Sequence, residues 1–339
     1  MAKKSFLFLT ATALITSLLL GGCGPRPTLP VEKEPDFPTK PITVIVPFSA
    51  GGGSDLQVRA LEKLAPKYLK QNFIVQNKTG GGGNIAYNEL VTSPADGYTV
   101  GMSYTGLILQ SLYGSTTYHY PTAMEPIVQF STAPVVLAIK ADQPWQTLDD
   151  LIAYCKQHPG EVKFGHAGIG DTSHLIGELF AQKAGISIEQ VPFRGASESI
   201  AALLGDHIEI ILGSPGALAE QIKSGTVRAL AISGEKHLTN PALANIPTFK
   251  ESGFDIVLEN WFGIASPKEI DPKIKAILAD AFTNMVADPE FKQSIEGLGM
   301  QVEYLNSADS IEKWRDDTEK LSKMINESGI INQIQQQKK

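Results

Sequence analysis

The sequence predicts an α/β protein whose parallel sheets carry helices on both faces. Short β-branched runs alternate with helical patterns along most of the 339-residue chain, and this alternation is typical of parallel sheets flanked by helices. At three points a glycine-rich loop separates a strand from the helix that follows it. A length of this size also predicts about two domains, at roughly 100 to 200 residues per domain.

Composition and charge narrow the class of protein. Hydrophobic residues make up 42% and charged residues 19% of the chain, which is ordinary for a globular protein and excludes disordered, collagen-like and coiled-coil classes. The formal net charge is −7 and the chain has no run of Lys or Arg. Binding to a phosphate backbone needs such a basic surface, so we expect no nucleic-acid partner.

The N-terminal segment has the form of a secretory signal. Two lysines precede an apolar stretch over 6–20, and small residues lead to Cys23; this order predicts a signal peptide over 1–22. The apolar stretch is shorter than the roughly 20 residues that a membrane-spanning helix needs. Because Leu20-Gly-Gly-Cys23 resembles the bacterial lipobox, we expect lipidation of Cys23. The proline-rich segment 23–38 indicates an extended tether, and only Cys155 would remain as a thiol.

The first predicted strand, 41–47, leads through a glycine loop over 48–55 into an amphipathic helix that reaches residue 68. We expect Ser54 to cap this helix, with Asp55 in its first turn. The same unit then recurs: a strand over 73–77, a second glycine loop over 80–83, a short helix over 85–91 and a strand over 98–103. This order of strands and helices is typical of a βαβαβ unit.

The alternation continues beyond residue 133. We expect strands at 134–140, 162–164, 188–192, 208–212 and 227–232, and helices at 148–157, 197–204 and 217–223. A third glycine loop, 168–174, opens a further helix with apolar residues on one face. The last third is helical, over 271–286, 289–298 and 307–325, and these helices should pack back on a domain.

The glycine loops are the candidate sites for chemistry. In open parallel sheets, ligands bind beyond the carboxyl ends of the strands, where loops lead into helix N-termini. Such loops present unpaired backbone N–H groups and the positive end of a helix dipole, which together favour an anion. A carboxylate fits this description in an acidic chain. The alternative, that Gly51–Gly53 and Gly80–Gly83 are only tight turns, stays open at this point.

Motifs for catalysis are missing from the sequence. It contains no P-loop and no G-x-S-x-G, H-E-x-x-H or C-x-x-C pattern, so we expect no enzyme activity and no cofactor. His166, His174 and Glu178 could be imagined as a metal cluster, but no third His or Cys lies near them in sequence. We expect no metal, and interpret His174 as a first-turn helix residue that packs locally.

Several motifs in order resemble one known family. They are PITVIVPFSAGGGSD at 41–55, GGGGN at 80–84, PADGY at 94–98, GIGDTSHL at 168–175 and VPFRG at 191–195. The chain resembles the substrate-binding proteins of the tripartite tricarboxylate transporter family, the TctC or Bug type, from about residue 37 to residue 330.

This resemblance implies a type II periplasmic-binding-protein fold: two doubly wound α/β domains joined by a hinge of two chain crossings. Domain 1 would comprise 39–137 and 262–335, and domain 2 would comprise 138–261. The crossings would lie near 134–140 and 259–265, and closure of the two domains would enclose the ligand.

The resemblance also implies the binding residues. Backbone N–H groups, hydroxyls and bridging waters of the first and third loops would hold a ligand carboxylate, and further residues would read out the rest of the ligand. The expected ligand-binding residues are Phe48, Ser49, Ala50, Gly51, Gly52, Ser54, Asp55, Thr105, Gly168, Ile169, Gly170, Asp171, Thr172, Ser173, Phe193, Arg194 and Pro215.

Asp171 departs from the family pattern, in which a small hydroxyl residue is common. Two interpretations stay open: Asp171 caps its helix, or it faces a ligand amine. The expected function is that of a membrane-tethered, extracytoplasmic and monomeric receptor that passes a small carboxylate (a di- or tricarboxylate, an amino acid or an aromatic acid) to integral-membrane transporter subunits. The alternatives are a ligand-presenting sensor subunit and, on the same scaffold, an enzyme.

Overall fold

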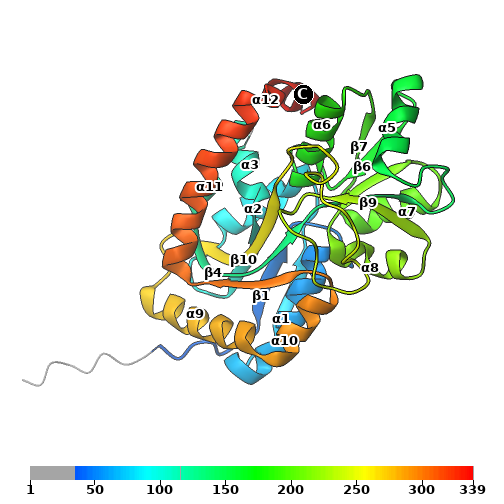
Figure 1. Cartoon of the computed structure of the whole chain (residues 1–339). Coiled ribbons are helices and arrows are strands. Elements are labelled where there is room, and N and C mark those ends of the chain that lie inside the picture. The colour runs from blue at the N-terminus through cyan, green and yellow to red at the C-terminus, as the bar shows by residue number, and fades with distance from the viewer. Residues whose placement is uncertain (1–34, 115, 339) are drawn as a thin grey trace, which may run out of the picture. The chain divides into compact units, whose positions relative to one another are not determined.

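Two β-sheets organise the computed structural model of the chain, which describes residues 35–114 and 116–338. The predicted signal peptide and Cys23 lie outside the described residues, as does most of the predicted tether. From Asp36 onward the chain forms one compact unit, and Figure 1 shows its two sheets with helices packed around them. In the described part of the chain, no helix is long and apolar enough to cross a membrane.

The larger sheet has six strands in the order β11-β4-β10-β3-β1-β2. Its strands are β1 (Ile42–Val46), β2 (Phe73–Asn77), β3 (Thr99–Tyr104), β4 (Met124–Pro134), β10 (Glu259–Pro267) and β11 (Gln301–Leu305). Strand β1 pairs in parallel with β2 and β3, whereas β10 pairs antiparallel with β3 and β4. We call this sheet and the helices packed on it the first lobe.

The smaller sheet has five strands in the order β7-β6-β8-β5-β9. Its strands are β5 (Val136–Lys140), β6 (Lys163–His166), β7 (Glu189–Pro192), β8 (Ile210–Gly213) and β9 (Val227–Ile232). Strand β6 is parallel to its neighbours β7 and β8, and β5 is antiparallel to β8 and β9. We call this sheet and the helices packed on it the second lobe.

Helices connect most of these strands. In the first lobe they are α1 (Gly53–Leu69), α2 (Asn84–Thr92), α3 (Gly106–Leu112), α4 (Tyr120–Ala123), α9 (Pro272–Ala287), α10 (Pro289–Gly297) and α11 (Ser307–Glu327). In the second lobe they are α5 (Leu148–Gln157), α6 (Thr172–Ala184), α7 (Ala196–Leu204) and α8 (Pro215–Lys223). The last helix, α12 (Ile330–Gln337), packs against α6 at the top of Figure 1.

The chain passes between the lobes along two adjacent strands. Strand β4 ends at Pro134 and β5 begins at Val136, so the first crossing is a single residue long. The return path enters β10 at Glu259, which is in register with Pro134 of β4. A continuous cluster of buried hydrophobic side chains extends from the first lobe across this crossing to α6.

The predicted α/β class is confirmed, and the predicted strands and helices that flank the glycine loops are present. The expectation of parallel sheets was wrong in one respect: both sheets are mixed, because the crossing strands β10 and β5 run antiparallel to their neighbours. Ser54 is not the helix cap; α1 begins at Gly53 after Gly52, and Ser54 lies in the first turn. The domain boundaries stay a prediction, although the strands from 42–134 and from 259–305 share one sheet.

Candidate functional site

A cavity of about 60 Å³ lies between the two lobes, large enough for about four water molecules. Its walls are strand ends and first turns of helices from both lobes. The lining residues are Phe48, Gly52, Gly53, Ser54, Tyr104, Val135, Ala167, Asp171, Ser173, Ala196, Leu212, Gly213, Ser214, Asn260 and Phe262. Lys, Arg and His are not among them, so fixed dipoles must provide any positive potential there.

Four helix N-termini meet at this cavity. Helix α1 contributes Gly52, Gly53 and Ser54, α7 contributes Ala196, and α8 is preceded by Ser214. Helix α6 contributes the fourth, where Asp171 is the cap. The N–H groups of a first turn have no intrahelical acceptor, and the helix dipole adds a positive partial charge at the same end. Asp171 supplies a carboxylate at α6, and Asp55 and Glu198 lie in the first turns of α1 and α7 without lining the cavity. At the cavity itself, an anion is the favoured partner of the α1, α7 and α8 ends.

Two polar atoms of the cavity wall lack a partner within the described residues. These are Ser214 Oγ and Asn260 Oδ1. Asn260 is only 9% exposed, and a buried polar atom without a hydrogen bond costs free energy that a bound ligand or water would recover. The cavity therefore has the donors and acceptors of a binding site.

Asp171 joins the two lobes at this site. Its Oδ1 accepts hydrogen bonds from the Ser173 amide, at 2.8 Å, and from the Ser173 hydroxyl. Its Oδ2 accepts from the hydroxyl of Tyr104, at 2.8 Å, across the cleft. Burial, with the Asp171 charge close by, raises the pKa of Tyr104 well above its ordinary value, so the phenol stays protonated and donates. The predicted capping role of Asp171 is present.

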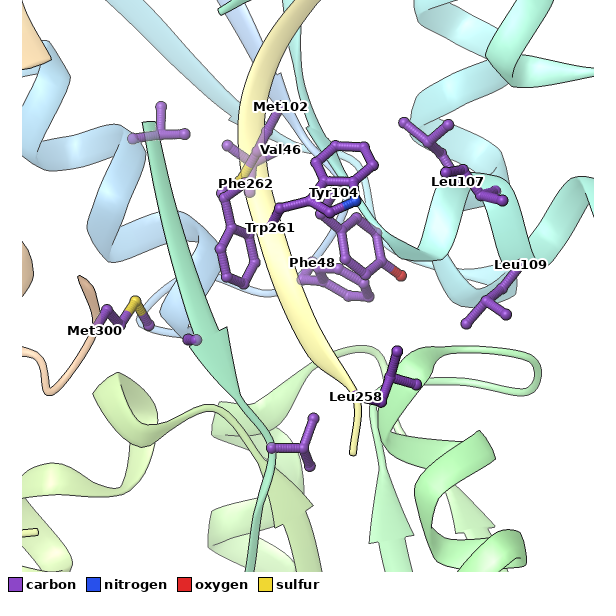
Figure 2. Close-up of a cluster of buried hydrophobic side chains, with 14 of the residues drawn as sticks. Val46, Phe48, Met102, Tyr104, Leu107, Leu109, Leu258, Trp261, Phe262 and Met300 are labelled. Atoms are coloured by element: carbon purple, nitrogen blue, oxygen red, sulfur yellow. The ribbon is translucent and has the colours of Figure 1, made fainter. Parts of the chain in front are cut away.

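The apolar side of the cavity is aromatic. The Phe48 and Tyr104 rings meet edge to face with centroids 5.2 Å apart, and Tyr104 stacks on Phe262 at 6.3 Å. Figure 2 shows these three rings grouped around β10 where that strand runs between the lobes. Rings arranged this way exclude water from one wall.

The first glycine loop contacts the loop before α7 in the other lobe. The amide of Ser49 donates to the carbonyl of Arg194 at 3.2 Å, and the hydroxyls of Ser49 and Ser197 are 2.7 Å apart. Ser197 also donates to the carbonyl of Ala50, at 3.0 Å. Within the loop, the Gly51 amide donates to Asp55 Oδ2 at 2.9 Å. Ser49 and Ala50 therefore join the lobes beside the cavity, whereas Gly51 and Asp55 bond to each other within the first loop, and none of the four lines the cavity.

Four other predicted residues line a second hollow of about 390 Å³. They are Gly168, Ile169, Phe193 and Arg194, which lie there with Gly80–Gly82 of the second glycine loop and with Lys338. The second and third loops touch: a Cβ at Gly168, whose φ is +126°, would lie 2.9 Å from the Gly82 amide nitrogen.

The remaining predicted residues lie behind the cavity wall. Thr105 Oγ1 accepts from the amide of Trp261 at 3.0 Å, and the Gly170 amide donates to His174 Nδ1 at 3.1 Å. Thr172 is fully buried, and Pro215 is the first residue of α8. Of the seventeen predicted residues, five line the cavity itself: Phe48, Gly52, Ser54, Asp171 and Ser173.

Sequence reasoning missed most of the opposite wall. Tyr104 follows the pattern used for the loops, because it ends the third strand and precedes a helix. Ser214 stands between a strand and a helix that begins with proline, which is also a readable signal. Asn260 lies inside a crossing strand and carries no local signal. The imagined metal cluster has another explanation: His174 Nε2 is 3.3 Å from Glu178 Oε1, and Glu178 accepts from Gln333 and Gln337.

Two α/β lobes are connected by two strands and enclose between them a cavity walled by helix N-termini. This arrangement is that of a two-lobed solute receptor. The chain belongs to the receptor family of the tripartite tricarboxylate transporters: the model described as "Tripartite tricarboxylate transporter family receptor" matches residues 57–330. The predicted family is confirmed. The family is one of extracytoplasmic substrate receptors rather than enzymes.

Two individual relatives support this family membership. The chain is 33% identical over 282 residues to a UPF0065 protein of Cupriavidus necator, covering 82% of this chain and 85% of that protein. It is 36% identical over 247 residues to the protein BugT of Bordetella pertussis, covering 71% and 75%.

Solved structures share the fold. The periplasmic binding protein BugD superimposes with a TM-score of 0.83 at 27% identity, covering 87% of this chain and 99% of that one. An R. palustris protein solved with adipate has a TM-score of 0.80 at 26% identity, with the same coverage. The predicted periplasmic-binding-protein fold is confirmed.

Proposed function

We propose that the cavity between the lobes binds one small carboxylate, which the receptor passes to the membrane subunits of a tripartite transporter. The observation that carries the proposal is the meeting of helix N-termini at the cavity between the lobes, beside the Ser214 hydroxyl, which has no hydrogen-bond partner among the described residues. Backbone N–H groups and a hydroxyl are the donors that a carboxylate accepts from. The adipate bound by the R. palustris relative is a ligand of this class.

Binding would couple to closure of the lobes. The hydrogen bonds of Tyr104 with Asp171 and of Ser49 with Arg194 and Ser197 join the lobes beside the cavity. An enclosed ligand would add its own bonds to both lobes, so the closed arrangement gains stability from the ligand. Ser49 and Ala50 of the first loop would then act as closure contacts.

The attachment to the membrane is a separate proposal. A signal peptide over 1–22, lipidation of Cys23 and a tether to residue 38 would place a monomeric receptor at the outer face of a membrane. Metabolic labelling with a palmitate analogue tests this: the full-length chain should take up the label, and Cys23→Ser should not. A wild-type chain without label would contradict the anchor.

The carboxylate site is tested by calorimetric titration with mono-, di- and tricarboxylates, amino acids and aromatic acids. Ser214→Ala should weaken binding of the acid that binds by about tenfold or more, since a hydrogen bond to a charged group contributes about 1.5–3 kcal/mol. Ser224→Ala is the matched control, because Ser224 caps the other end of α8 and bonds only to its own turn. Equal affinities for the two variants would contradict a role for Ser214.

A further inference from the structure

The charge balance of the cavity deepens the proposed function, on which this inference rests. Among the described residues that line the cavity, Asp171 alone carries a formal charge, and it is only 4% exposed. A ligand with two carboxylates would place its second negative charge beside this one in a cavity of about 60 Å³. Like charges at such short range oppose binding where water is excluded.

The carboxylate of Asp171 can still accept a hydrogen bond. A carboxylate offers about four acceptor positions. The structure fills three of them, with the Ser173 amide, the Ser173 hydroxyl and the Tyr104 hydroxyl. Among the described residues only Tyr104 donates to Oδ2, which leaves one acceptor position open on the oxygen that faces the first lobe.

A second oxygen atom in the same cavity also has room for a hydrogen-bond donor. Asn260 Oδ1 is buried and has no partner among the described residues. Asp171 and Asn260 reach the cavity from different lobes, one as the cap of α6 and the other from β10. A group with several N–H donors and a positive charge satisfies both oxygens.

The remaining walls have the opposite character. The N-termini of α1, α7 and α8 present first-turn N–H groups, which have no acceptor within their own helix, and the Ser214 hydroxyl has no partner among the described residues. The N-terminus of α6 differs from them at the cavity, because its cap Asp171 lines the cavity, whereas Asp55 of α1 and Glu198 of α7 do not. The cavity therefore has a donor side and an acceptor side, within the length of a small molecule.

We infer that the ligand is a small zwitterion, an amino acid whose carboxylate binds the donor side and whose ammonium group binds Asp171 and Asn260. Asp171 is then a specificity-determining residue that favours amino acids over dicarboxylates. The two sequence-based interpretations of Asp171, as helix cap and as partner of a ligand amine, become compatible because different lone pairs serve the two roles.

The test compares acids that differ only in the amine. L-alanine and L-serine are titrated beside propionate and 3-hydroxypropionate, with succinate as the dicarboxylate. The wild-type receptor should bind at least one amino acid at least tenfold more tightly than its counterpart without the amine and than succinate. In Asp171→Asn, which keeps the shape and the cap, that ratio should fall to about threefold or less.

A matched variant separates charge in the cavity from helix capping. Asp271 caps α9 by accepting from the Lys273 amide at 2.7 Å, as Asp171 accepts from the Ser173 amide, and it is not a cavity residue. Asp271→Asn should keep the wild-type ratio. If Asp171→Asn does not fold, Asp171→Ser is the second variant, because serine also caps helices.

The outcomes distinguish this inference from the proposed function. A wild type that binds succinate as tightly as the amino acids overturns the zwitterion and leaves the carboxylate receptor intact. A preference for amino acids that persists in Asp171→Asn and Asp171→Ser overturns the role of Asp171. A protein that binds none of the acids, with or without an amine, overturns both.

Discussion

The hydroxyl of Tyr104 lies 2.8 Å from Oδ2 of Asp171, and this contact joins the end of β3 in the first lobe to the cap of α6 in the second. Both side chains are buried and both line the cavity. The residue that shapes the charge of the site thus also links the two halves of the receptor. Affinity and closure should change together when this bond is removed.

Tyr104→Phe tests that link. The variant keeps the ring packed on Phe48 and Phe262 and removes only the donor, so we expect ligand affinity to fall by about tenfold or more, given about 1.5–3 kcal/mol for a hydrogen bond to a charged group. Titration calorimetry measures the change. Tyr304→Phe is the control, because its hydroxyl bonds to Thr283 on the surface, away from the cavity. Equal affinities for the two variants would exclude the bond as a closure contact.

Gly195→Ala tests the contact between the first glycine loop and the loop before α7. A Cβ at Gly195 would lie 2.2 Å from Ser49 Oγ and 2.8 Å from the Ser49 amide nitrogen. The backbone at Gly195 is extended, so alanine adopts it without strain. The added methyl group therefore acts only through its clash with Ser49 of the opposite lobe, which opposes closure. We expect affinity to fall at least tenfold with little change in the free energy of unfolding. Gly297→Ala, with no heavy atom within 4 Å of its Cβ, should bind normally; equal binding by both variants would count against closure at this loop.

Asp317→Ala tests the packing of α11 on the crossing strand. Asp317 Oδ2 accepts from the indole nitrogen of Trp261 at 2.8 Å, and Trp261 stacks on Trp314. Without the carboxylate a buried N–H loses its partner, which should lower the free energy of unfolding by about 1–3 kcal/mol. Urea unfolding gives the value. Asp316→Ala, next to it and exposed, should change stability by less than about 0.5 kcal/mol; a similar loss in both would refute the argument.

His166 should make the protein less stable in mild acid. It is fully buried, Nδ1 accepts from the Gly168 amide at 3.2 Å, and Nε2 lies 2.7 Å from Gln190 Oε1. Burial, and secondarily His174, lower its pKa to about 3 from an ordinary 6.5. Below pH 6.5, His166 therefore binds a proton in the unfolded chain but stays neutral in the folded chain. The resulting stability is complete above pH 6.5 and is lost by up to about 1.4 kcal/mol per pH unit as the pH falls toward 3.

Unfolding free energies between pH 6.5 and pH 5 measure this slope before most carboxylates titrate. His166→Gln should be flatter than the wild type across that interval. His207→Gln, at an exposed position, should keep the wild-type slope. A slope unchanged by His166→Gln would show that another group is responsible.

Short sequence patterns predicted those strands and helices that depend mainly on residues close together in the sequence. The first strand, the helices after the glycine loops and the strand at 227–232 have periodicity and loop chemistry in one short segment, and the structure has them at nearly the same residues. Strand β4 was not predicted, because its polar residues Gln129, Ser131 and Thr132 are buried by distant partners. Ser131, for example, donates to Gln57 on α1.

The site divides in the same way. Loop residues such as Gly52 and Ser54 were predicted, because a glycine loop before a helix is a local signal. The residues of the far wall were not predicted. Asn260 reaches the cavity because β10 pairs with β4, and the residues next to Asn260 in sequence do not indicate that pairing. Ligand binding by Ser49 and Ala50 stays a prediction, and their bonds to the opposite lobe in this structure could not be predicted from local patterns.

The central claim is that the cavity between the lobes holds a small carboxylate. Its most direct test is calorimetric titration of the purified receptor with the acid panel, together with mass spectrometry of small molecules released on denaturation. We predict saturable binding of one ligand per chain by at least one acid, or release of such an acid from the protein as purified. A receptor that releases no organic acid and binds none more tightly than about 1 mM, roughly 4 kcal/mol of binding free energy, would contradict the account.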